Sequence, residues 1–175
     1  SLEDIRKLFG ADVAMLVDGL TKIKDINIID KEEAHIENIR KMLLAMNKDI
    51  RVIFIKLCDR LHNMRTLSAK KEDRQRAIAL ETMYIYAPLA HRLGLYGIKS
   101  EMEDIWLRYK EPEAFHEITA KINRNVIDKD KEINDFITPI VESLNAAGFQ
   151  FTVKKRVKTP YSIWNKMVTK GITFD

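Results

Sequence analysis

Residues 52–67, VIFIKLCDRLHNMRTL, carry polar side chains that could bind a metal and a substrate along an otherwise apolar run. On a helical wheel, Asn63 lies within about 40° and Thr66 within about 20° of Asp59. His62 lies at the edge of the same face. A carboxylate can ligate a cation while a neighbouring amide and hydroxyl form hydrogen bonds to a substrate. The spacing therefore predicts the floor of a small polar pocket.

A purely structural interpretation of these residues stays open. A helix this apolar is normally buried, and burying an ionised carboxylate without compensation is costly. Asp59 is therefore expected to meet a metal, a cation or several hydrogen-bond donors, and Arg60 or Arg65 could supply that cation. Asn63 could instead satisfy the backbone of a loop. His62 is expected to be a packed, hydrogen-bonded histidine rather than a ligand.

The composition favours a mainly helical, soluble protein. The chain has 175 residues, 46% of them hydrophobic, with Gly 6 and Pro 4, which are too few turn residues for an all-β fold. Its single cysteine, Cys58, rules out an internal disulfide framework and indicates a reducing compartment. There is no run of about 18 apolar residues and no signal-peptide pattern. A cytoplasmic location without membrane contact is the expectation.

Positive charge is concentrated near the C-terminal end. The net charge of +4 is too small to predict nucleic-acid binding. Residues 152–171, TVKKRVKTPYSIWNKMVTKG, contain six lysines and arginines and no acidic residue, whereas residues 101–117 are rich in acids. The six cations are Lys154, Lys155, Arg156, Lys158, Lys166 and Lys170. This segment could attract an anionic ligand or be a solvated basic surface.

Helix signals cover the first 148 residues. A capping box at Ser1 and Asp4 opens a short helix that Gly10 ends. Later stop signals are Pro88, expected to kink or break a helix, and Gly94, expected to cap it. The other helical patterns cover residues 11–20, 31–47, 50 onward, 72–94, 98–110 and 112–148, the last with Pro139 marking a bend or joint.

The pattern changes after Gly148. Phe149, Phe151 and Val153 alternate with polar neighbours, as in a half-buried strand. A helix is then expected from Pro160 to the residues before Gly171. The sequence thus predicts a helical unit followed by the first strand and helix of an α+β unit, and the chain is expected to be a piece of a longer protein.

Four blocks resemble the RelA/SpoT family, bacterial enzymes of the stringent response that make and degrade the alarmone (p)ppGpp. They read VAMLVDGLTKI, RKMLLAMNKDIRVIFIKLCDRLHNMRTL, ETMYIYAPLAHRLGLYGIKSEMEDIWLRY and RVKTPYSIWNKM. The last is similar to the start of the family's synthetase domain, where the consensus sequence is Gly-Arg-Pro-Lys-His-x-Tyr-Ser-Ile-Tyr-x-Lys-Met. The resemblance implies three parts: the end of a helical His-Asp-type phosphohydrolase domain at 1–75, connecting helices at 76–110, and the opening of an α+β, nucleotidyltransferase-like synthetase domain at 111–175.

For the hydrolase, the resemblance implies that Asp59 is the last ligand of a single Mn²⁺ and that Asn63 and Thr66 contact the nucleotide. The reaction would release pyrophosphate from the 3′ position of (p)ppGpp and leave GDP or GTP. The family's other ligands, a lone His and a His-Asp pair, are expected upstream of Ser1. None of the four histidines matches them: His35, His62, His91 and His116.

For the synthetase, the resemblance implies that four residues bind ATP, which acts with Mg²⁺: Arg156, Lys158, Ser162 and Lys166. Arginine can stack on adenine and bind phosphate, and lysine supplies a point charge for a transferring pyrophosphoryl group. Lys155, Val157 and Thr159 replace the family's Gly, Pro and His, so the loop geometry differs from the usual pattern. The catalytic acids and the guanine-binding tyrosine are expected beyond Asp175.

The implied partners are guanine nucleotides (ppGpp, pppGpp, GDP and GTP) and ATP. Ribosome association would depend on regions outside this sequence, and no oligomeric state is predicted. The 175-residue chain by itself is expected to be inactive. The alternative, from another functional class, is a catalytically decayed helical module that regulates or binds a partner.

Overall fold

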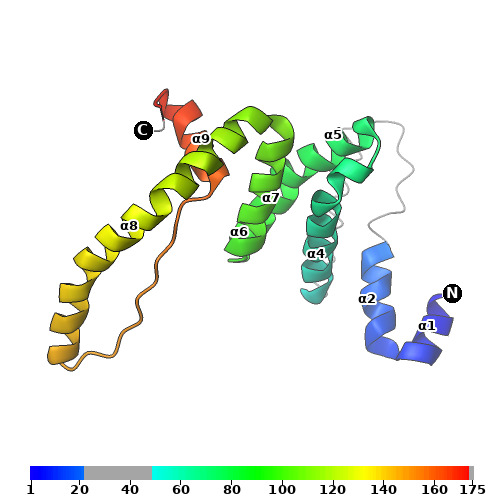
Figure 1. Ribbon diagram of the computed structural model, residues 1–175. Coiled ribbons are helices and arrows are strands. Elements are labelled where there is room, and N and C mark those ends of the chain that lie inside the picture. The colour runs from blue at the N-terminus through cyan, green and yellow to red at the C-terminus, as the bar shows by residue number, and fades with distance from the viewer. Residues whose placement is uncertain (22–48, 174–175) are drawn as a thin grey trace. The chain divides into compact units, whose positions relative to one another are not determined.

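The computed structural model describes residues 1–21 and 49–173, leaving out the side chains of residues 125–130, and all regular elements in these stretches are helical (Figure 1). The elements are α1 (Leu2–Phe9), α2 (Ala11–Thr21), α4 (Arg51–Arg65), η1 (Leu67–Ala69), α5 (Glu72–Glu81), η2 (Thr82–Tyr86), α6 (Ala87–Arg92), α7 (Tyr96–Lys110), α8 (Pro112–Ala146) and α9 (Pro160–Lys170). The prediction of a mainly helical protein is confirmed. The helix expected over 31–47 lies outside the described residues.

The chain divides into two compact units, Ser1–Met102 and Glu103–Asp175, and the boundary falls inside α7.

None of the helices in the described ranges is both long and apolar enough to cross a membrane.

The first unit begins with the predicted capping box. The Ser1 hydroxyl accepts a hydrogen bond from the Asp4 amide, the Asp4 carboxylate accepts one from the Ser1 backbone, and Gly10 ends α1 at a φ of 88°. Further along, Gly19 permits a close approach of α2 to α4. A Cβ atom there would lie 2.9 Å from Cγ2 of Val52, so a larger residue would require Val52 or the helices to shift.

Helix α4 supplies much of the core of this unit. Its buried side chains are Val52, Ile53, Leu57, Leu61 and Met64. These residues recur at helical spacing, so burial keeps one face of α4 against neighbouring helices and turns the opposite face outward. The outward face holds the polar residues of the predicted site.

A π-helical turn, η2, precedes Pro88. The amide of Ala87 donates to the carbonyl of Thr82, five residues earlier. Proline cannot donate to a carbonyl and crowds the residue four positions before it, and a π-turn is one way to accommodate both effects within a helical run. The chain stays helical from Glu72 to Arg92, so the helix does not break at Pro88 and the irregularity there is this π-turn. Gly94, with a φ of 74°, lies just after the end of α6 as expected.

In the second unit, α8 runs without a break through Pro139. Pro139 is therefore not a joint between two helices. After α8, the chain runs back along this helix toward α9 (Figure 1), and Lys155 Nζ donates a hydrogen bond to Oδ1 of Asn134. Helix α9 has the predicted bounds, since Pro160 is its first residue and Gly171 follows it in the left-handed conformation with a φ of 61°.

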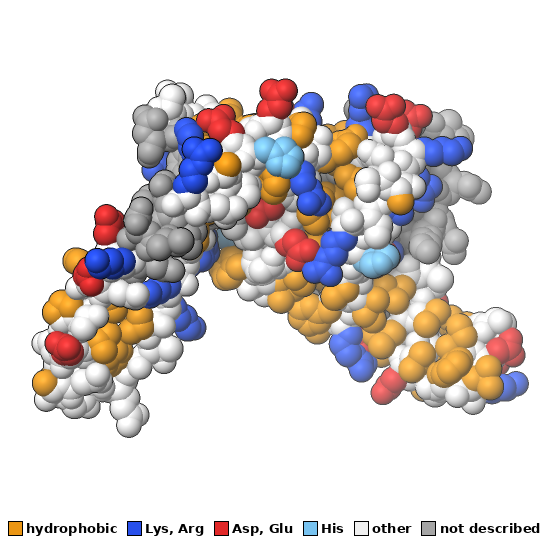
Figure 2. Space-filling view, in the orientation of Figure 1, with side chains coloured by type: hydrophobic (Ala, Val, Ile, Leu, Met, Phe, Trp, Pro, Cys, Tyr) orange, Lys and Arg blue, Asp and Glu red, His pale blue; other side chains and the backbone are white. Residues whose placement is uncertain are grey.

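The strand expected after Gly148 is not present. Residues 149–159 form no regular structure, and Phe149, Phe151 and Val153 are 63%, 38% and 46% exposed. A strand requires a neighbour for its backbone hydrogen bonds and a surface for its apolar side chains, and the described residues offer no second strand. Hydrophobic side chains also gather on the surface over the C-terminal half of α8 (Figure 2), where Phe136 is 72% exposed.

Candidate functional site

Helix α4 brings the predicted polar residues together on its outer face. The Asn63 amide donates to the Asp59 carbonyl at 2.9 Å and to Oδ1 of the Asp59 carboxylate at 3.3 Å. One helical turn after His62, the Thr66 hydroxyl donates to the His62 carbonyl at 3.0 Å. Asp59 is exposed, and Asn63 and Thr66 are half-buried. The helical wheel therefore placed the three side chains correctly.

The expectation that Asp59 is buried is wrong. It lies about 200° around the helix from Leu57, which is fully buried, so the packing that buries one turns the other outward. Among the described side chains, no cation forms an ion pair with Asp59. The structural alternative, in which a neighbouring arginine neutralises this carboxylate, does not hold among these residues.

Both neighbouring arginines have other partners. Arg60 Nη2 lies 2.5 Å from Oε2 of Glu81, and its guanidinium lies 4.2 Å from the ring centroid of Tyr86. Arg65 binds Glu101 through two contacts, and this hydrogen-bonded guanidinium lowers the pKa of Glu101 although partial burial opposes the shift. These contacts keep positive charge away from the Asp59 carboxylate.

The described residues do not by themselves form the manganese site that the family resemblance implies. No group of three or more His, Cys, Asp or Glu side chains in the described part of the chain could hold a metal ion. Asp59 offers a single carboxylate there, whereas a tight site for a hard divalent cation needs several oxygen or nitrogen ligands.

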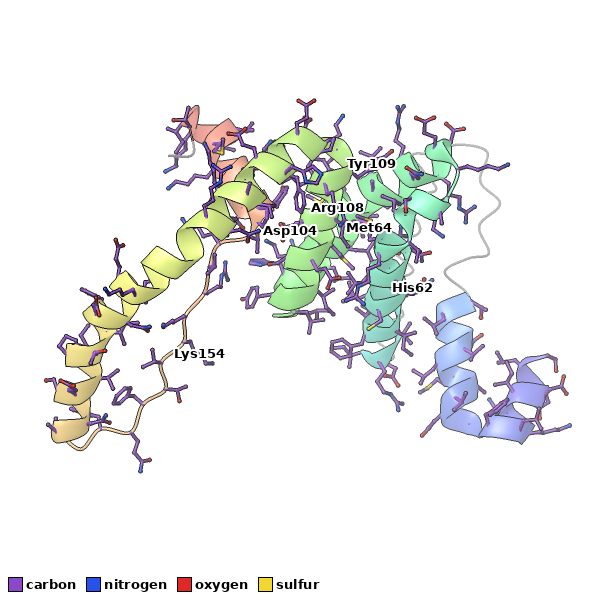
Figure 3. The ribbon with its side chains drawn as sticks, in the orientation of Figure 1. His62, Met64, Asp104, Arg108, Tyr109 and Lys154 are labelled. Atoms are coloured by element: carbon purple, nitrogen blue, oxygen red, sulfur yellow. The ribbon has the colours of Figure 1, made fainter. Side chains whose placement is uncertain are left out.

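The histidines take no part in a metal cluster in the described ranges. His62 lies in the last turn of α4 (Figure 3) and is exposed, so it is not the packed histidine that was expected. The ring of His91 meets Tyr96 edge-on at 5.4 Å, and the ring of His116 meets that of Phe115 at 5.8 Å. His35 lies outside the described residues.

The residues expected to bind ATP lie in the second unit. Arg156 and Lys158 are exposed on the irregular segment before α9, which also carries Lys154 (Figure 3), and Lys166 is exposed on α9. Ser162 is different, because its hydroxyl lies 2.9 Å from the hydroxyl of Thr159. The four residues are thus three exposed cations and a serine that is part of a helix cap.

Thr159, which replaces the family's histidine, is the N-cap of α9. Its hydroxyl accepts a hydrogen bond from the Ser162 amide at 3.3 Å. The substitution therefore keeps a group that can begin the helix. The sequence motif suggested this cap only through Pro160 at the helix start.

Sequence analysis missed two residues of α7 that contact α9. Oδ1 of Asp104 accepts a hydrogen bond from the Tyr161 amide at 2.9 Å (Figure 3 labels Asp104). The ring of Trp106 packs edge-on against Tyr161 and Trp164, at centroid distances of 6.0 and 5.8 Å. These contacts join residues 55 to 58 positions apart, and the only signal at this place was an acid-rich stretch.

Comparison with known proteins identifies the class of the first unit. The family model for the HD domain matches residues 1–96, a stretch that includes α4 and its polar face. The chain belongs to the HD domain family.

Matches to individual proteins indicate a narrower family than the HD domain model does. Over 99% of its length the chain is 46% identical to "GTP pyrophosphokinase" of Myxococcus xanthus and 41% identical to "GTP pyrophosphokinase rsh" of Brucella ovis. Over 98% it is 44% identical to "Bifunctional (p)ppGpp synthase/hydrolase SpoT" of Escherichia coli K12. The resemblance to the RelA/SpoT family is confirmed, and the chain spans 23–24% of the length of these relatives.

Proposed function

We propose that this chain is the central part of a bifunctional (p)ppGpp hydrolase/synthetase of the bacterial cytoplasm. Residues 1–75 would end the hydrolase domain, 76–110 would form connecting helices, and 111–175 would open the synthetase domain. Supporting this, the HD domain match covers residues 1–96 and the relatives carry names for both activities. The proposed substrates are (p)ppGpp for hydrolysis, and GDP or GTP with ATP for synthesis.

The observation that carries the hydrolase proposal is the unpaired carboxylate on the outer face of α4. Asp59 is exposed beside Asn63 and Thr66, and no arginine or lysine of the described ranges neutralises it. We assign Asp59 as one metal ligand, and Asn63 and Thr66 as nucleotide contacts. The remaining Mn²⁺ ligands would come from outside the described residues.

The synthetase proposal depends on the basic segment. Arg156, Lys158 and Lys166 are exposed, and residues 152–171 contain no acid. Side chains of this type can bind the base and phosphates of ATP, with Mg²⁺ bound to the nucleotide. Ser162 would contribute a hydroxyl while it also takes part in the cap of α9.

The test uses the full-length protein that contains this chain, with hydrolysis and synthesis of (p)ppGpp measured for each variant. Asp59→Ala should abolish hydrolysis and retain synthesis. Asn63→Ala and Thr66→Ala should raise KM for (p)ppGpp. The matched control is Asp135→Ala, which removes an exposed carboxylate from α8 and should change neither activity.

Variants of the synthetase residues are expected to show the reverse pattern of activities. Arg156→Ala and Lys158→Ala should impair synthesis and leave hydrolysis intact, each lost charged contact being worth roughly 1.5 to 3 kcal/mol if it is desolvated. Lys170→Ala, at the end of α9, is the matched control. A folded Asp59→Ala protein that lost synthesis as completely as hydrolysis would contradict the separate hydrolase site. Absence of both activities from the unsubstituted protein would favour the regulatory module.

A further inference from the structure

Side-chain oxygens accept hydrogen bonds from the backbone amides in the first turn of α9. Pro160, its first residue, has no amide proton to satisfy. The next amide, that of Tyr161, donates to Oδ1 of Asp104 at 2.9 Å, and the amide of Ser162 donates to the Thr159 hydroxyl at 3.3 Å. The free amides that make a helix N-terminus attractive to phosphate are therefore already occupied.

Aromatic packing fixes the same end of α9. Trp106 meets Tyr161 and Trp164 edge-on, with interplanar angles of 83° and 62°. The rings of Tyr161 and Trp164 lie 6.0 Å apart. Burial raises the pKa of Tyr161, with a smaller contribution from the negative charge of Glu103, so the phenol lies in a partly desolvated contact. The hydrogen bond sets where α9 begins, and the rings restrict its rotation.

We propose that Asp104 is a positioning residue for ATP binding in the synthesis reaction. By holding the amide of Tyr161, it fixes the first turn of α9 and, with it, Ser162 and Lys166. This inference rests on the proposed function of the second unit.

The occupied amides also determine where the phosphates bind. Because the Tyr161 amide donates to Asp104 and the Ser162 amide donates to Thr159, neither amide is free to bind a phosphate. Binding of the ATP phosphates is then carried by the cationic side chains Arg156, Lys158 and Lys166, rather than by the amides of α9. Asp104 therefore acts on ATP through the position of α9.

The kinetic test compares Asp104→Ala with Asp104→Asn in the full-length protein. Asparagine keeps an oxygen that accepts the Tyr161 hydrogen bond, whereas alanine removes it. Asp104→Ala should raise KM for ATP about fivefold, the effect of losing one helix cap, and change kcat by less than about twofold. Asp104→Asn should keep KM within about twofold of the unsubstituted value, because the cap is retained. Asp135→Ala is the control for loss of an exposed carboxylate.

A spectroscopic test does not depend on activity. The 175-residue chain has two tryptophans, Trp106 and Trp164, and their rings are in contact. Near-ultraviolet circular dichroism therefore reports this contact. Asp104→Ala should weaken the tryptophan signal with no loss of far-ultraviolet helical signal, and Asp104→Asn should retain both signals.

The outcomes separate this inference from the proposed function. If the unsubstituted full-length protein makes no (p)ppGpp, the proposed function fails. The positioning role is tested separately by circular dichroism, and an unchanged tryptophan signal in Asp104→Ala would overturn it. If synthesis is present, an unchanged KM for ATP in Asp104→Ala overturns the inference. An equal rise of KM for ATP in Asp104→Asn also overturns the inference. Unfolding of Asp104→Ala overturns it as well, because the residue would then stabilise the fold as a whole.

Discussion

Arg65 of α4 and Glu101 of α7 form a two-point ion pair, with Nε 2.6 Å from Oε1 and Nη2 2.9 Å from Oε2. The geometry is the paired arrangement that a planar guanidinium makes with a carboxylate. The hydrogen-bonded guanidinium holds the pKa of Glu101 below its ordinary value of 4.5. The pair lies within the first unit and gives Arg65 a partner other than Asp59.

The first prediction concerns the pH dependence of this ion pair. Since the pKa of Glu101 is lower in the folded than in the unfolded chain, the pair stabilises the fold above the unfolded value and loses this effect as pH falls through the folded value. Glu101→Gln should therefore lower the free energy of unfolding at pH 7 but not below the folded pKa. Urea unfolding at both pH values measures the difference, which should be small and decrease in high salt because both side chains are exposed. An equal effect at both pH values would contradict it.

The second prediction concerns Arg60. Its side chain is only 14% exposed, between the carboxylate of Glu81 and the ring of Tyr86. Arg60→Ala should lower the free energy of unfolding by about 1–2 kcal/mol, mainly through the lost contact with the ring and the lost packing of the stem. Arg60→Lys should recover only part of this, because lysine lacks the planar group. Arg76→Ala, on the exposed side of α5, serves as control and should change stability by less than about 0.5 kcal/mol in urea unfolding.

The third prediction follows from the exposure of Asp59. Asp59→Ala in the 175-residue chain should change the free energy of unfolding by no more than about 0.5 kcal/mol, with alanine favoured slightly by its higher helix propensity. Thermal and urea unfolding check this directly. Strong destabilisation would show that Asp59 has a structural partner, and the assignment of this carboxylate to a ligand site would then lose its basis.

Local signals in the sequence predicted local structure well. The capping box at Ser1 and the bounds of α9 between Thr159 and Gly171 depend on neighbouring residues, and both are confirmed. The common face of Asp59, Asn63 and Thr66 follows from helix geometry alone, so the wheel was sufficient.

Features that depend on distant residues were not predicted. The exposure of Asp59 is set by what packs against Leu57, and the partners of Arg60 and Arg65 come from other helices. The alternation of apolar and polar residues after Gly148 predicted a strand. Its backbone would need to pair with a second strand, which the described residues do not supply. The Asp104 contact, across 57 positions, has no sequence pattern of its own.

The fourth prediction concerns the ionisation of Tyr161. Burial, assisted by Glu103, raises the pKa of this phenol above its ordinary value of 10.0. Because the folded pKa is higher than the unfolded one, Tyr161 has no effect on stability well below pH 10 and favours unfolding as pH rises above it. Alkaline titration of phenolate absorbance in the unsubstituted chain and in Tyr161→Phe isolates this group by difference. The difference should titrate above 10.0. If the difference titrated at or below pH 10.0, the phenol of Tyr161 would be solvated, and the packing of Trp106 against the first turn of α9 would be too loose to position that helix.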